Sequence, residues 1–120
     1  MSNLIYKVSI GVLLLVALLL AWRCLTLYRQ MVTAAFISGQ CEMTEDHSVG
    51  ETNPAALAQN LEFLTGYYRG YSRTLVGSPI YRVVERDYQH ALTNTLTQFR
   101  SIATNDLGSD PRVWIQKYGK

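Results

Sequence analysis

The stretch Ile10-Gly-Val-Leu-Leu-Leu-Val-Ala-Leu-Leu-Leu-Ala-Trp22 determines how this chain is organised. No charge falls between Lys7 and Arg23, which leaves fifteen uncharged residues, about 23 Å of helix at 1.5 Å per residue. A membrane span needs about twenty mostly apolar residues, more than a buried helix of a soluble core usually has. Lys7 and Arg23 can extend their charged ends toward water, and Leu4 begins the apolar segment early. Residues 1–22 are therefore predicted to form a single transmembrane anchor.

A cleaved signal peptide is the main alternative for this segment. Cleavage requires small residues soon after the apolar run, but Trp22-Arg23-Cys24-Leu25 follows here. The same four residues make a poor lipoprotein site, because an arginine precedes the cysteine. We therefore expect an uncleaved signal anchor that makes the chain single-pass.

Orientation depends on the charges that flank the anchor. Lys7 and the terminal amine stand on one side, and Arg23 and Arg29 stand on the other, so the positive-inside rule does not decide. The very short amino tail favours an orientation with the tail in the cytoplasm and the C-terminal body outside it.

Residues 23–38 are predicted to continue the helix as an amphipathic stalk. Its apolar residues recur at three-four spacing on one stripe: Leu25, Tyr28, Val32 and Ala35. Ser38-Gly39 is the first stop signal, because glycine suits a helix C-cap, so the first helix is predicted over residues 4–38. Residues 39–53 gather acidic and small polar side chains without a hydrophobic period, which predicts a flexible acidic loop.

Two helices that form an antiparallel hairpin are predicted over residues 54–104. Asn53-Pro54 supplies an N-cap followed by proline at the first helical position. The first helix, expected to end at Val76-Gly77, carries a narrow apolar seam: Leu57, Leu61, Leu64, Tyr68, Tyr71 and Leu75. Ser78-Pro79 starts the second helix, whose apolar face contains Val84, Tyr88, Leu92, Leu96, Phe99 and Ala103. Helices of matching length joined by so short a turn must pack antiparallel.

The tail, residues 105–120, begins with a turn cluster, and Asp110-Pro111 then starts a short helix that places Trp114 and Tyr118 on one side. Its acidic-apolar-Gly-x-Asp-x-x-x-Trp pattern is similar to a short ending of various bacterial proteins. That resemblance implies a bacterial source, hence an inner membrane, and helix packing. The expected fold class is all-α, with an anchor, a stalk, a hairpin that the stalk would complete as a three-helix bundle, and a helical tail.

One face of the first hairpin helix is a candidate helix interface. It lies away from the seam and consists of Phe63, Gly66, Tyr67, Gly70 and Thr74. Each glycine inside a helix costs about 1 kcal/mol, so two of them beside aromatic rings indicate that another backbone approaches closely. The neighbour would be the stalk, a second copy of the chain or a different protein. Flexible glycines on a solvated face are the alternative.

A second candidate surface is the tip of the hairpin, where the short turn brings four arginines together: Arg69, Arg73, Arg82 and Arg86. Such a tip can meet anionic lipid headgroups, an acidic partner or nucleic acid. A solvated basic tip, partly neutralised by Glu85 and Asp87, is the simpler interpretation. The formal net charge of +2 is too small to favour nucleic acid as a partner.

No motif for catalysis, nucleotide binding or metal binding is present in the sequence. Asp87-x-x-His90 is half of a di-iron carboxylate motif, but a bundle site needs two such halves. Cys24 and Cys41 form no disulfide framework. We therefore expect a non-enzymatic protein with no cofactor and no metal.

The expected function is that of a scaffold or accessory subunit in a membrane-associated assembly. Its partners would be the lipid bilayer and another protein or a second copy of itself. The alternative is a sensor-like ligand-binding module that holds a small molecule among Tyr67, Tyr68, Tyr71, Tyr81 and Tyr88.

Overall fold

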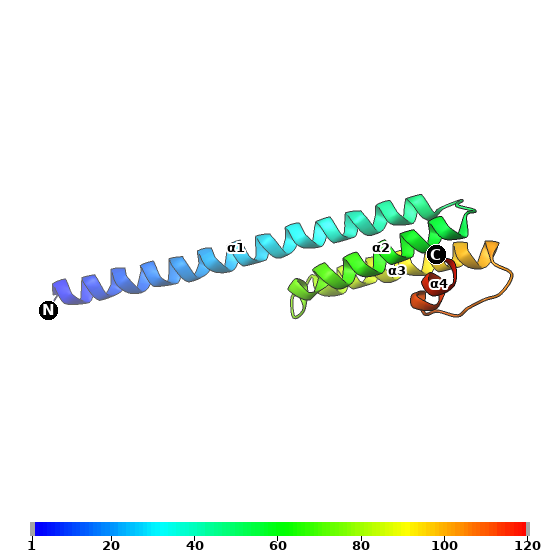
Figure 1. The fold of residues 1–120 in the computed structure, drawn as a ribbon. Helices are drawn as coiled ribbons and strands as arrows, with labels where there is room; N and C mark the ends of the chain where they lie inside the picture. The colour runs from blue at the N-terminus through cyan, green and yellow to red at the C-terminus, as the bar shows by residue number, and fades with distance from the viewer. Residues whose placement is uncertain (1, 120) are drawn as a thin grey trace.

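The computed structural model describes residues 2–119, which contain helices and no strand, so the all-α prediction is confirmed. Figure 1 shows one long helix with a bundle at its C-terminal half. The elements are α1 (Ser2–Ser48), α2 (Pro54–Tyr71), the 3₁₀ turn η1 (Ser72–Leu75), α3 (Tyr81–Ile102) and α4 (Pro111–Tyr118). Together they make a rod of 84 × 21 × 20 Å.

The first half of α1 projects alone from the bundle (Figure 1). It is long and apolar enough to cross a membrane, and none of its apolar window is buried inside the protein. Leucines such as Leu13 and Leu18 are each 68% exposed, whereas a helix of a soluble core would bury such side chains. The exposed apolar surface is therefore consistent with a membrane anchor at the N-terminus.

The second half of α1 packs against both α2 and α3. Its buried residues follow helical spacing and face the bundle: Ala34, Ile37, Cys41, Thr44 and Ser48. The predicted helix end at Ser38 is therefore wrong, and so is the predicted acidic loop over 39–53, because residues 39–48 are helical. Gly39 is exposed and lies in mid-helix, while Gly50 has the left-handed φ of +74° that ends the segment.

Tertiary packing explains this extension. Ile37 is 0% exposed and Cys41 2% exposed, so a helix that ended at Ser38 would leave the hairpin without the second of these apolar contacts. Burial of such residues outweighs the roughly 1 kcal/mol that glycine costs in a helix interior. The true connection between α1 and α2 is the short segment 49–53.

The two hairpin helices share an apolar core. Asn53 caps α2, since its Oδ1 accepts a hydrogen bond from the Ala55 N–H at 3.0 Å. Most of the predicted seam and of the predicted α3 face is buried: Leu57, Leu61, Leu64, Leu75, Val84, Tyr88, Leu92, Leu96 and Phe99. The exceptions are Tyr68 and Ala103, which are partly buried, and Tyr71, which is 50% exposed.

The hairpin boundaries differ slightly from the prediction. The α-helix ends at Tyr71 and tightens into η1 before Gly77, which has a φ of +83°. Ser78 does not cap α3 directly, because that helix begins at Tyr81. The Ser78 Oγ instead accepts a hydrogen bond from the Ile80 N–H at 3.3 Å and so shapes the turn before the helix.

The predicted tail helix is confirmed as α4. Asp110 caps it, with Oδ1 accepting from the Arg112 N–H at 3.0 Å. Trp114 is 0% exposed, its ring centroid lies 4.9 Å from that of Phe99, and its indole Nε1–H donates to the Gly108 carbonyl at 3.0 Å. The tail therefore adds a large aromatic side chain to the hairpin core.

Polar contacts fix the register between α1 and the hairpin. Ser38 donates a hydrogen bond to Asp87 at 2.8 Å, and farther along α1 Glu45 accepts one from Asn94. At the loop end, the Gln98 side chain donates to the Glu51 carbonyl at 2.7 Å. A shift of α1 by one turn would break all three contacts, so the hairpin is held at a defined height along the stalk.

We expect Gly39→Ala to stabilise the protein by about 0.5–1 kcal/mol, because alanine is the better residue in a continuous helix. Gly50→Ala should instead destabilise it by about 1–2 kcal/mol, because alanine disfavours the left-handed conformation. Thermal unfolding of the two variants in one detergent measures both effects. Destabilisation by Gly39→Ala would mean that α1 ends at Ser38 after all.

Candidate interaction surfaces

Four aromatic rings form a ridge along the junction of α1 and α2, and we call them the aromatic ridge: Phe36, Phe63, Tyr67 and Tyr71. The Tyr67 ring centroid lies 6.1 Å from that of Phe36, 5.5 Å from Phe63 and 4.5 Å from Tyr71. Phe36 remains 58% exposed, Phe63 46% and Tyr71 50%. The ridge is therefore an ordered apolar surface that the bundle itself does not cover.

Two of the predicted interface residues, Phe63 and Tyr67, belong to this ridge, and the other three lie beside it. Gly66 and Gly70 are exposed, and a Cβ atom at either position would meet no other atom within 4 Å in residues 2–119. The stalk therefore does not approach these glycines, although α1 contributes Phe36 beside Tyr67. Thr74 lies beyond them in η1, exposed, with its hydroxyl donating to the Tyr71 carbonyl at 2.9 Å.

Such a surface is unfavourable for an isolated chain in water. Apolar area costs about 25 cal/mol per Å² when it stays exposed, and contiguous apolar patches mark binding sites on soluble surfaces. Two uncrowded glycines beside the ridge leave room for an incoming helix to approach the α2 backbone. The sequence pattern identified the α2 part of this surface, but it missed Phe36, which joins it only because α1 packs on the hairpin.

The four tip arginines, Arg69, Arg73, Arg82 and Arg86, are all exposed. None of them forms an ion pair within residues 2–119, where the recorded pairs involve His90, Arg100 and Arg112. The expected neutralisation by Asp87 is not observed. That carboxylate instead accepts the hydrogen bond from Ser38 on α1.

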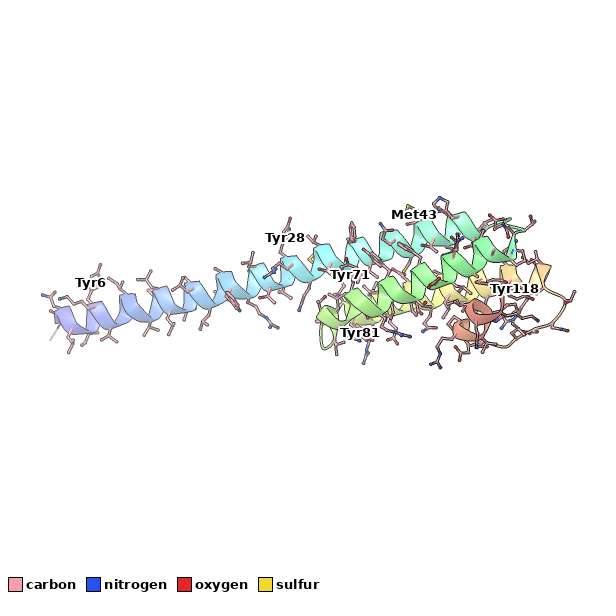
Figure 2. All side chains as sticks on the ribbon, in the orientation of Figure 1. Tyr6, Tyr28, Met43, Tyr71, Tyr81 and Tyr118 are labelled. Carbon is pink, nitrogen blue, oxygen red and sulfur yellow. The ribbon has the colours of Figure 1, made fainter. Side chains whose placement is uncertain are left out.

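The five tyrosines of the ligand-binding alternative do not line one pocket. Tyr67 and Tyr71 belong to the aromatic ridge, whereas Tyr68, Tyr81 and Tyr88 line a groove between α2, α3 and the start of α4. Figure 2 shows Tyr71 and Tyr81 on opposite sides of the hairpin tip. The helical pattern did place Tyr67 and Tyr68 on different faces of α2, but it assigned Tyr71 to the seam, whereas the structure places Tyr71 beside Tyr67.

Within the second group, Tyr68 and Tyr88 stack closely, with ring centroids 3.9 Å apart and planes inclined by 3°. Burial raises the pKa of both phenols, so both stay neutral at ordinary pH. The groove beside them is open and shared by Arg69, Arg73 and Arg112. A stacked pair of neutral rings packs the hairpin near its tip, which is a structural role.

Metal-binding side chains do not gather anywhere in the described part of the chain. No group of three or more His, Cys, Asp and Glu residues has a suitable arrangement there. His90 lies 3.4 Å from a Glu45 oxygen, and Asp87 is bound to Ser38. Both residues of the half motif thus contact α1 and help to hold the stalk.

The two cysteines have different environments. Cys24 is exposed just beyond the anchor, and Cys41 is buried between α1 and the hairpin. Burial is the main cause that raises the pKa of the Cys41 thiol from 9.0 to about 11, and the Asp87 and Glu45 carboxylates contribute to the same shift. Because the thiolate is the nucleophile, Cys41 should be unreactive in the folded protein.

Comparisons with protein-family models, with curated proteins and with solved structures found no match for this chain.

We expect a thiol reagent at pH 8 to alkylate Cys24 and to leave Cys41 unmodified until the protein unfolds. Mass spectrometry of the two cysteine peptides, with a denatured sample as the control, measures this. The folded state holds the Cys41 proton more tightly than the unfolded state does. The contribution of Cys41 to the free energy of unfolding should therefore be fully present below pH 9.0 and should be lost as the pH rises toward about 11. Equal labelling of both thiols in the folded sample would show that Cys41 is not packed against the hairpin.

Proposed function

We propose that the chain is a membrane-anchored, non-enzymatic helical module that acts as a scaffold or accessory subunit of a membrane-associated assembly. The observation that carries this proposal is the aromatic ridge, an ordered apolar surface exposed beside two uncrowded glycines. Interfaces are enriched in Tyr and Phe at their centres. The ridge therefore suits docking of a helix from another protein or from a second copy of the chain.

Rigidity supports the same proposal. The anchor and the bundle share the single helix α1, which at 1.5 Å per residue extends about 70 Å. A continuous helix transmits the position of the anchor to the ridge, so the ridge stays at a constant distance from the bilayer. An accessory subunit needs such a constant distance, because its partner is anchored in the same membrane.

The location of the body is part of the proposal. The resemblance of the tail to bacterial endings favours a bacterial inner membrane, and the short amino tail favours a cytoplasmic N-terminus with the body outside. Cys41 is unsuitable for testing this orientation because it is buried. The exposed positions Ser2, at the start of α1, and Ser101, at the end of α3, suit such a test.

Replacing Gly66 and Gly70 with leucine should leave the monomer folded, because open space surrounds both positions, and should weaken assembly. Filling the space for an incoming helix should weaken association at least tenfold, about 1.4 kcal/mol. A mild-detergent pull-down with mass spectrometry identifies the partner, and light scattering of the purified chain counts its copies. Gln89→Leu with Thr93→Leu is the matched control, since these exposed residues have the same spacing on α3. Unchanged assembly in the glycine variant would remove the basis of the proposal.

We expect Ser101→Cys, in a Cys24→Ser background, to react with a membrane-impermeant thiol reagent on intact cells. Ser2→Cys in the same background should react only after permeabilisation. The labelling yield of each variant is measured on a gel. A denatured sample shows that each thiol can react with the reagent. The reverse pattern would place the body in the cytoplasm.

A further inference from the structure

The tip of the hairpin points back toward the anchor. After α1 the chain turns at residues 49–53, and α2 runs back antiparallel to α1. The turn between η1 and α3 is therefore the end of the bundle that lies nearest the anchor (Figure 1). One hydrogen bond fixes the level of this turn, since Ser78 Oγ donates to Gln30 Oε1 at 3.3 Å. Gln30 lies eight residues beyond Trp22, about 12 Å along the helix axis.

This distance brings the tip close to the bilayer surface. If the apolar core ends near Trp22, the headgroup layer fills about the next 5–8 Å. The electrostatic potential of that layer extends a further 8 Å or so at physiological ionic strength. The turn at about 12 Å therefore lies within reach of headgroup charge, and nearby arginine side chains can extend toward it. Arg86 lies farther away, because its neighbour Asp87 bonds to Ser38, which is about 24 Å beyond Trp22 along the helix axis.

Charge is distributed unequally along the rod. The four tip arginines lie at the end of the bundle nearest the anchor, and Arg23 and Arg29 lie on the adjoining part of α1. We call these six residues the basic face. No acidic residue precedes Glu42 in the sequence, and Glu85 is the one acidic residue between Glu62 and Arg86, where it stands among the tip arginines. All six arginines are exposed, and none forms an ion pair within the described residues. The cationic end of the bundle is thus the end that faces the membrane.

Two further features suit the basic face to a lipid surface. Val76 stands at the turn itself and is 69% exposed, which places an apolar side chain among the arginines. A notch of about 270 Å³ lies between η1 and α1 and is lined by Thr26, Arg29, Gln30, Thr33, Thr74 and Leu75. Arg29 supplies the only charge in that lining, so an anionic group that enters the notch meets a cation.

We propose that the basic face binds the phosphate groups of anionic lipid headgroups in the leaflet beside the body, and so holds the bundle down on the membrane. Each arginine near an anionic surface strengthens such binding about fivefold. Nucleic acid is disfavoured, because it would have to enter the narrow space between the tip and a surface of its own charge sign. The proposal requires that α1 cross the bilayer, but it does not require a protein partner.

The test uses the full chain in nanodiscs. Val76→Cys in a Cys24→Ser background carries a nitroxide, and the buried Cys41 remains unlabelled. The collision rate of the nitroxide with a water-soluble nickel chelate is compared with its collision rate with lipid-soluble oxygen. The ratio of the two rates reports the depth of the nitroxide relative to the bilayer. We expect the label to be protected from the chelate in discs that contain phosphatidylglycerol, and to be more accessible in discs of phosphatidylcholine alone.

Charge variants identify the cause of the protection. Arg69→Gln, Arg73→Gln, Arg82→Gln and Arg86→Gln together should remove the difference between the two lipids. The matched control carries Gln59→Glu, Thr93→Glu, Thr97→Glu and Gln116→Glu, which make the same change in net charge at exposed positions outside the basic face. It should retain the difference, and circular dichroism verifies that both variants are folded.

Three outcomes would overturn the proposal. The label could be equally accessible in both lipids, or equally protected in both, which would leave the headgroup charge without a role. The four-arginine variant could behave like wild type although it is folded. An oligonucleotide that binds the disc-embedded chain and restores chelate access would instead assign the basic face to nucleic acid. None of these results depends on whether the aromatic ridge binds a partner.

Discussion

The continuity of α1 through Gly39 is the constraint on which the rest of the structure depends. The helix runs without a break from Ser2 to Ser48, so the segment that suits a membrane and the segment that completes the bundle are one rigid element. Its stripe of Ile37, Cys41, Thr44 and Ser48 gives α2 and α3 a third helix to pack on. With a loop in place of residues 39–48, the hairpin would be tethered loosely and its height and direction would vary.

Rigid attachment fixes each surface of the bundle relative to the apolar half of α1, and hence to the membrane that the proposed function places there. The aromatic ridge runs beside α1 and faces sideways, toward the space that a neighbour anchored in the same bilayer would occupy. The basic face is directed back along α1 toward its apolar half, where we propose that it meets lipid headgroups. These two surfaces use different residues and different physics, apolar burial in one and electrostatic attraction in the other. Binding of lipid at the tip would limit rocking of the bundle and so present the ridge in one orientation.

The same arrangement explains why the polar residues that resemble a metal site have another use. Asp87 and His90 lie on the side of α3 that faces α1, where they meet Ser38 and Glu45. Hydrogen bonds between helices of this kind contribute modestly to stability, about 0.5–1.5 kcal/mol each, but they are directional. Their effect is to select one register of stalk against hairpin among several that apolar packing alone would permit.

By itself the sequence determined the elements of this protein and most of their buried faces. Periodicity identified the hairpin core from Leu57 to Phe99, and proline after a capping residue located the starts of α2 and α4. The uncharged run from Val8 to Trp22 identified the helix that is long and apolar enough to cross a membrane. These signals are local along the chain. Only the tertiary structure decided what happens at Gly39, where long-range burial of Cys41 and Thr44 outweighs a local stop signal. It alone also brought Phe36 to Tyr67, moved Tyr71 from the predicted seam to the aromatic ridge and turned the arginines toward the N-terminal half of α1. Each of these depends on contacts between residues distant in sequence, for which the local pattern contains no information.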